Sequence, residues 1–122
     1  NELLAASYNE THLKKRLTEQ LFLVAEEDEE IIGFANFIYG EELYLAAHYV
    51  RPESQHKGYG TSLLTEGLNQ FKGQYDTVYL EVDNKNNHGI DYYKENGFEI
   101  VRSYQPEMYG ETMDLALMKK SF

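Results

Sequence analysis

Residues 43–71, LYLAAHYVRPESQHKGYGTSLLTEGLNQF, give the strongest indication of the fold, because the spacing of the apolar side chains changes within this stretch. Residues 43–50 are rich in β-forming side chains, and Pro52 ends that run because proline cannot donate to a strand ladder. From Gly58 onward the apolar residues recur with helical spacing, and Gly73 marks the end of the pattern. The apolar stripe consists of Leu63, Leu64, Leu68 and Phe71. We therefore predict a strand, a loop and a helix that packs this stripe on a sheet.

A second strand is predicted over Thr77–Val82, shortly after this helix. A strand, a helix and a strand in succession form a right-handed crossover, so residues 43–50 and 77–82 should be parallel neighbours in one sheet. A ligand can enter where such strands end. The crossover is therefore where we expect a binding site.

Upstream of the crossover, Leu3–Gln20 carries leucines at mixed helical spacings and is predicted to be helical. Leu21–Ala25 and Ile31–Tyr39 are β-rich runs on either side of the acidic turn 26–30, a pattern that predicts a β-hairpin. Together with residues 43–50, these runs give three consecutive antiparallel strands.

Downstream of the crossover, we predict a short helix containing Ile90 and Tyr93, with Asn96-Gly97 as its C-terminal cap. Two final strands are predicted over Phe98–Tyr104 and Thr112–Met118. The order of these elements predicts a single α+β (mixed α/β) domain over residues 1–122, with helices flanking a central sheet.

Composition excludes several classes of function. The formal net charge of -10 argues against a nucleic-acid partner, which would need clustered lysine and arginine, and makes a cationic partner more plausible. The absence of cysteine fits a reducing cytoplasm, where we expect the protein. No apolar run approaches the roughly 20 residues that span a bilayer, so no membrane partner is expected. The four histidines are isolated in the sequence, and no metal site is predicted.

The loop Gln55–Gly60 has the features of an anion-binding site. It lies between the predicted strand and helix, where a helix N-terminus presents unpaired N–H groups and glycines allow close approach to the backbone. A dinucleotide-binding motif would need glycine where Leu63 stands, and the chain contains no Walker A string. From the residues alone, a glycine-containing loop that merely begins a helix remains an alternative.

Two ordered motifs resemble those of the GNAT acetyltransferases. Tyr49-Val50-Arg51-Pro52, then Gln55-x-x-Gly58-x-Gly60 and Leu63-Leu64, resembles the family's acetyl-CoA signature. Asn86, followed by the stretch from Ile90 to Gly97-Phe98, resembles the second signature. The resemblance implies a mostly antiparallel sheet with a central parallel crossover, and acetyl-CoA as a cosubstrate.

The resemblance covers roughly residues 21–119, and the family's first strand and part of its first helix are expected to be missing from this chain. It implies that backbone groups of the strand end hold the pantetheine arm and the thioester carbonyl, and that amides of the loop cradle the pyrophosphate. The strand-end residues are His48, Tyr49 and Val50, and the loop residues are Gln55, His56, Lys57, Gly58, Tyr59, Gly60 and Thr61. Asn86 would bind the cofactor arm. Tyr93 would lie near the sulfur and act as the general acid.

The general base is left open. Some family members carry a glutamate on the strand before the loop, but the corresponding residue here is Tyr44. Glu81 on the following strand, His48 at the strand end and a water relay all remain candidates.

The predicted function is direct transfer of acetyl from acetyl-CoA to a primary amine in a ternary complex. Tyr109–Lys120 looks like the ending of a bacterial polyamine-acetyltransferase branch, which, with the acidic composition, makes a polyamine a candidate acceptor. A peptide or protein amine and an aminoglycoside are the alternative acceptors. A non-catalytic acyl-CoA-binding regulatory module is the alternative function, and a homodimer is left open.

Overall fold

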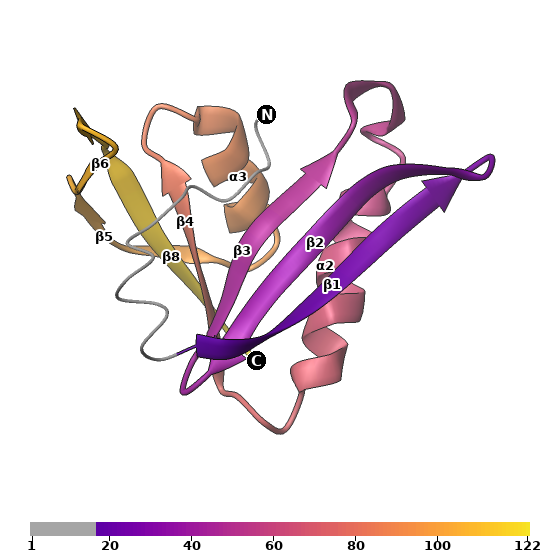
Figure 1. Cartoon of the computed structure of the whole chain (residues 1–122), viewed down its shortest axis with the longest axis horizontal. Helices are drawn as coiled ribbons and strands as arrows, with labels where there is room; N and C mark the ends of the chain where they lie inside the picture. Colours follow the sequence, from indigo (N-terminus) through magenta and orange to yellow (C-terminus); the bar gives the residue numbers. More distant parts are fainter. Residues whose placement is uncertain (1–16) are drawn as a thin grey trace.

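The computed structural model describes residues 17–122 (Figure 1). The first strand, β1, spans Leu17–Glu27, so the helix predicted over Leu3–Gln20 is wrong for its last four residues, and its other residues lie outside the described part. The reason is long-range pairing, because the ladder between β1 and its neighbour extends to Leu17 opposite Gly40. Partners distant in sequence override a weak local helical pattern.

The predicted hairpin is confirmed, with longer strands and a shorter turn. β2 spans Glu30–Gly40 and pairs antiparallel with β1. Asp28 and Glu29 connect them with φ angles of 53° and 69°, the left-handed conformation that a tight two-residue hairpin turn requires at both positions. β3 spans Leu43–Val50, as predicted, and pairs antiparallel with β2.

Six strands of the described residues form one sheet in the order β1-β2-β3-β4-β8-β5. β4 spans Thr77–Asp83, β5 spans Glu99–Tyr104 and β8 spans Leu115–Ser121. β3 and β4 are parallel and the other pairs are antiparallel, which confirms the predicted fold class.

The last strand begins three residues later than predicted. A small hairpin of β6 (Glu107–Met108) and β7 (Glu111–Thr112) precedes it, with its turn at Tyr109 and Gly110. Thr112 therefore pairs with Glu107, and only the residues from Leu115 onward join the central sheet.

The two α-helices of the described residues pack on the sheet through one shared apolar cluster. α2 spans Tyr59–Phe71 and α3 spans Asn87–Glu95, and a 3₁₀ turn, η1, covers Pro52–Ser54. The cluster includes Phe37, Leu43 and Leu45 from the sheet, Leu63, Leu64 and Phe71 from α2, and Ile90 and Tyr93 from α3. Neither of these α-helices in residues 17–122 is long and apolar enough to cross a membrane.

The parallel strands separate toward their C-terminal ends, as Figure 1 shows. Their described ladder joins Leu43 to Val78 and Tyr44 to Tyr79, both near the beginning of the strands. Beyond these pairs β3 and β4 diverge, and α3 lies beside the opening (Figure 1). The loop from η1 to α2 continues from the end of β3, so the fold brings this loop to the same opening.

Candidate active site

The loop before α2 presents backbone N–H groups as an anion site would. His56 and Gly58 have φ angles of 65° and 90°, and alternation with left-handed residues turns successive amides toward one side of a loop. No side chain in residues 17–122 caps the N-terminus of α2, so its first-turn amides keep their hydrogen-bonding capacity. The positive end of the helix dipole points at the same place.

The two glycines of the loop are needed for different reasons. Gly58 is the N-cap of α2, and its positive φ is a conformation that side chains with a Cβ rarely adopt. Gly60 has an ordinary φ but is crowded, since a Cβ there would lie 3.2 Å from the Tyr92 hydroxyl and 3.6 Å from His48 Nε2. Glycine at position 60 therefore lets α2 approach both β3 and α3 closely.

Glu27, at the end of β1, fixes the outer side of the loop. Its carboxylate accepts hydrogen bonds from Lys57 Nζ at 3.1 Å, from the Tyr59 hydroxyl at 2.9 Å and from Ser54 Oγ at 2.9 Å. These bonds, led by that of Lys57, hold the pKa of Glu27 below its usual value. The hairpin predicted as a plain structural element thus also holds the loop in place.

The cationic side chains beside the loop are bound to carboxylates of the hairpin. Lys57 is paired with Glu27, and Arg51 donates to Glu30 at 2.9 Å. Their charges are therefore partly neutralised, so an anion bound at this loop would interact mainly with the backbone amides and the helix dipole.

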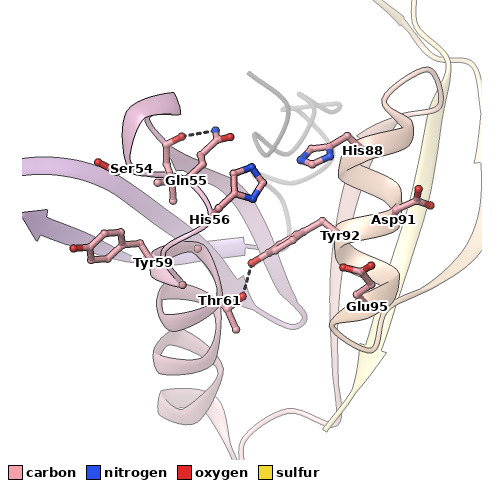
Figure 2. A pocket seen from close by; sticks show the side chains of 12 residues that line it. Ser54, Gln55, His56, Tyr59, Thr61, His88, Asp91, Tyr92 and Glu95 are labelled. Atoms are coloured by element: carbon pink, nitrogen blue, oxygen red, sulfur yellow. Dashed lines mark hydrogen bonds between the residues drawn. The ribbon is translucent and has the colours of Figure 1, made fainter.

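A pocket of about 380 Å³ lies between the loop and α3 (Figure 2). One wall is the loop and the first turn of α2, and the other is the exposed side of α3. The lining residues are Val50, Ser54, Gln55, His56, Gly58, Tyr59, Gly60, Thr61, His88, Asp91, Tyr92 and Glu95. The predicted phosphate loop thus forms half of a real cavity.

Tyr92 connects the two walls of this pocket. Its ring extends from α3 toward α2, and its hydroxyl shares a hydrogen bond of 3.1 Å with Thr61 Oγ1 (Figure 2). Partial burial raises its pKa, and the bond with Thr61 lowers it in part. Any anion bound by the first turn of α2 would therefore lie beside a phenol hydroxyl.

His48 and Tyr93 lie beneath the pocket, and neither side chain is exposed to solvent. His48 Nε2 donates to the carbonyl oxygen of Gly60 at 2.8 Å, and its Nδ1 lies 3.2 Å from the Tyr93 hydroxyl. Burial lowers the pKa of His48, while the bond to Gly60 raises it in part. Burial also raises the pKa of Tyr93, and the adjacent Tyr92 raises it further.

Glu81 lies on β4 just beyond the described ladder with β3, where the two strands separate. Strand alternation places it on the face opposite Leu80 and Val82, away from the two helices. Its side chain is only 6% exposed, and burial raises its pKa from 4.5 to about 7, against the opposing charge of Arg102. A carboxyl group that titrates near neutral pH can act as a base.

The structure brings most of the predicted cofactor residues together. Val50, Gln55, His56, Gly58, Tyr59, Gly60 and Thr61 line the pocket. Gln55 also donates from Nε2 to the Val50 carbonyl at 2.8 Å, which holds the loop against the strand end.

Three predicted residues have other contacts. Lys57 points to Glu27, the ring of Tyr49 packs against Phe34, and Asn86 Oδ1 accepts from the amide of Gly89 as the cap of α3. The proposed cofactor roles of Lys57 and Tyr49 concern their backbone groups, so these side-chain contacts are compatible with them.

Sequence reasoning missed Tyr92 and Glu27. Tyr92 had a signal, because it precedes Tyr93 on a helix already assigned to the site. Glu27 had none, since it lies in an acidic turn far from the loop in sequence. Within residues 17–122, no group of three or more histidine, aspartate or glutamate side chains is placed to hold a metal ion.

Comparisons with known proteins give a family match, a curated relative and similar solved structures. A profile of the acetyltransferase (GNAT) family matches residues 2–98. Peptidyl-lysine N-acetyltransferase YiaC of Escherichia coli K12 is 33% identical over 78 residues, which are 64% of this chain and 49% of that protein. The chain therefore spans about half the length of this curated relative.

Two solved structures with ligands are similar to this one. The PaiA N-acetyltransferase of Thermoplasma acidophilum, in complex with coenzyme A, has a TM-score of 0.68 and 28% identity, covering 84% of this chain and 61% of that one. A GNAT family acetyltransferase of Elizabethkingia anophelis, with acetyl-CoA bound, has a TM-score of 0.71 and 19% identity, covering 93% and 84%.

Proposed function

The chain belongs to the acetyltransferase (GNAT) family, and we propose that it transfers the acetyl group of acetyl-CoA to a primary aliphatic amine. The main support for this proposal is the N-terminus of α2, which no side chain of the described residues caps and which faces a pocket beside the end of β3, beyond the described ladder of β3 with β4. An anion site beside a gap between strands suits a ligand with a pyrophosphate and a long flexible arm.

The residues present fit such a ligand. We assign the pyrophosphate to the amides of His56–Thr61, because the predicted donor at Gln55 already bonds the Pro52 carbonyl at 3.3 Å. The arm is assigned to the end of β3, His48–Val50. The side chain of Asn86 is assigned to the same arm, beside its role as the cap of α3. The hydroxyl of Tyr92 adds a donor that the sequence motif did not include.

Acid and base lie on opposite sides of the opening. Tyr93 is on the face covered by the helices, and Glu81 is on the other face of β4. Bound acetyl-CoA supplies an activated acetyl group. Glu81 takes the proton that the amine nitrogen loses as the N–C bond forms, and Tyr93 gives a proton to the sulfur as the C–S bond breaks. Proton exchange with solvent then restores both side chains.

The acceptor is proposed to be an aminoalkyl group. YiaC is named for peptidyl-lysine acetylation, and the net charge of -10 favours a cationic acceptor of any kind. A polyamine and a lysine side chain both present a primary amine at the end of an alkyl chain. The resemblance of Tyr109–Lys120 supports the polyamine, and the similarity to YiaC supports the peptide.

The test is an acceptor panel of polyamines, lysine peptides, peptide N-termini and aminoglycosides, with release of the free CoA thiol as the readout. We expect thiol release that depends on an aminoalkyl acceptor. Tight binding of acetyl-CoA without thiol release from any acceptor would instead indicate the non-catalytic module. Tyr44 in place of a glutamate motivates that alternative, whereas the near-neutral pKa of Glu81 favours an enzyme. Sedimentation of the same sample would test the homodimer.

A further inference from the structure

His48 is a fully buried imidazole between the cofactor loop and α3. One ring nitrogen bonds the Gly60 carbonyl in the first turn of α2, and the other lies within hydrogen-bonding distance of the Tyr93 hydroxyl. The rings of Tyr92 and Tyr93 pack at centroid distances of 5.9 and 6.0 Å from the imidazole. This one side chain therefore contacts both the proposed anion site and the proposed acid.

The partners of His48 determine where its proton lies. A carbonyl oxygen can only accept, so Nε2 must carry the proton that it donates to Gly60. Within residues 17–122 the hydrogen-bond partners of His48 are a carbonyl and a phenol rather than a carboxylate, and burial disfavours the charged imidazole, so we take the ring as neutral. Nδ1 then has no proton and acts as an acceptor, so in the resting state the single proton of the Tyr93 hydroxyl points at Nδ1. This bond breaks when Tyr93 gives that proton to the sulfur.

We infer that His48 is a positioning residue, which holds the hydroxyl of Tyr93 through Nδ1 and the first turn of α2 through Nε2. This inference rests on the proposed function, because it gives Tyr93 the role of acid. It also changes the role of His48, since a neutral histidine whose two nitrogens are both engaged is poorly suited to act as the general base. The position of the proposed acid and the position of the proposed cofactor loop thus both depend on the imidazole of His48.

Two substitutions separate the two bonds. In His48→Asn, the amide oxygen can occupy the place of Nδ1 and accept from Tyr93, but the bond to Gly60 is lost. In His48→Gln, the amide nitrogen can occupy the place of Nε2 and donate to Gly60, but the acceptor for Tyr93 is lost. His48→Leu removes both bonds, and circular dichroism checks that each variant folds.

We expect a split between kcat and KM. His48→Asn should raise KM for acetyl-CoA about tenfold with a smaller change in kcat, and His48→Gln should lower kcat about tenfold with a smaller change in KM. A merely structural histidine would give similar losses of both parameters in both variants, and that result would overturn the inference.

Nitrogen-15 NMR of the wild-type histidines tests the same geometry without any variant of His48 and without activity. We expect a protonated Nε2 and a bare Nδ1 for His48, with the Nδ1 signal shifting in Tyr93→Phe. Tyr75→Phe is the matched control, since that hydroxyl donates to the Gly40 carbonyl at 2.7 Å and makes no contact with His48. A protonated Nδ1 would overturn the inference. Failure of all acceptors in the panel would instead overturn the proposed function, and the NMR result would still stand.

Discussion

Replacing Glu81 by glutamine removes the carboxylate of β4 while keeping the size of the side chain. If Glu81 is the base, kcat should fall by about 10² or more, since positioned proton transfer contributes roughly 10² to 10⁴. The wild-type rate should rise with pH through about 7, because the base works only when it is deprotonated. Rising pH also deprotonates the amine acceptor and so raises the rate of both proteins. The readout is therefore the ratio of wild-type to variant rates, measured as CoA thiol release across the pH range.

Stability provides a second and independent readout of the same change. In the unfolded chain Glu81 ionises near 4.5, whereas in the folded chain it stays protonated up to about 7. The wild-type protein therefore loses stability as pH rises between these values, because its folded state binds more protons than its unfolded state. The Glu81→Gln variant does not show that loss, since glutamine does not ionise. The rise of the pKa from 4.5 to about 7 corresponds to about 3 to 4 kcal/mol at most, and we expect about 2 kcal/mol after allowance for solvent screening.

The assay is urea unfolding of both proteins at about pH 5 and about pH 8. The stability of Glu81→Gln relative to wild type should be higher at about pH 8 than at about pH 5, because most of the window between 4.5 and about 7 lies between these two values. An equal difference at both pH values would refute the raised pKa. A change in kcat of less than about tenfold would refute the assignment of Glu81 as the base and would favour the water relay.

Four other substitutions probe the pocket and the residues that support it. Gly60→Ala places a methyl group against the Tyr92 hydroxyl, and should raise KM for acetyl-CoA about tenfold while the fold persists, as circular dichroism would check. Glu27→Gln weakens the hydrogen bond from Lys57 and loosens the loop, so KM for acetyl-CoA should rise. Because the pKa of Glu27 is lowered, the wild-type protein should show the same rise in KM only at a pH below the usual pKa range of a glutamate. Tyr93→Phe should lower kcat, whereas Tyr92→Phe should mainly raise KM, both from steady-state kinetics.

Each of these predictions can fail clearly. An unchanged KM in Gly60→Ala would mean that no ligand approaches the first turn of α2. An unchanged KM in Glu27→Gln would mean that the loop keeps its shape without its tether to β1. Equal effects of the two tyrosine variants on kcat would remove the distinction between Tyr92 and Tyr93.

The local sequence pattern was sufficient to predict an element when its conformation depends mainly on its own residues. The run 43–50, the hairpin and the helix after Gly58 were all predicted, because strand alternation, turn residues and helical spacing are local properties. The prediction failed for residues 17–20, whose conformation is set by pairing with the end of β2. It also misplaced the start of β8, because a separate small hairpin includes Thr112.

The residues of the candidate site also separate into those that local sequence pattern predicts and those that only the folded structure reveals. The anion loop was found because glycine spacing before a helix is visible in the sequence. Glu27 was not found, since its bonds to Lys57 and Tyr59 depend on the folded position of β1. The distinction between Tyr92 and Tyr93 was also hidden, because consecutive residues of a helix point in different directions and a short helix gives little information on its phase.

Transfer of a labelled acetyl group distinguishes acetyl transfer by this chain from binding of the cofactor alone. Acetyl-CoA labelled in the acetyl group is incubated with the protein and either a lysine peptide or a polyamine, and mass spectrometry follows the label. We expect the label to appear on the primary amine in a one-to-one ratio with free CoA thiol. Thiol release without labelled amine, or no release with any acceptor, would contradict the account.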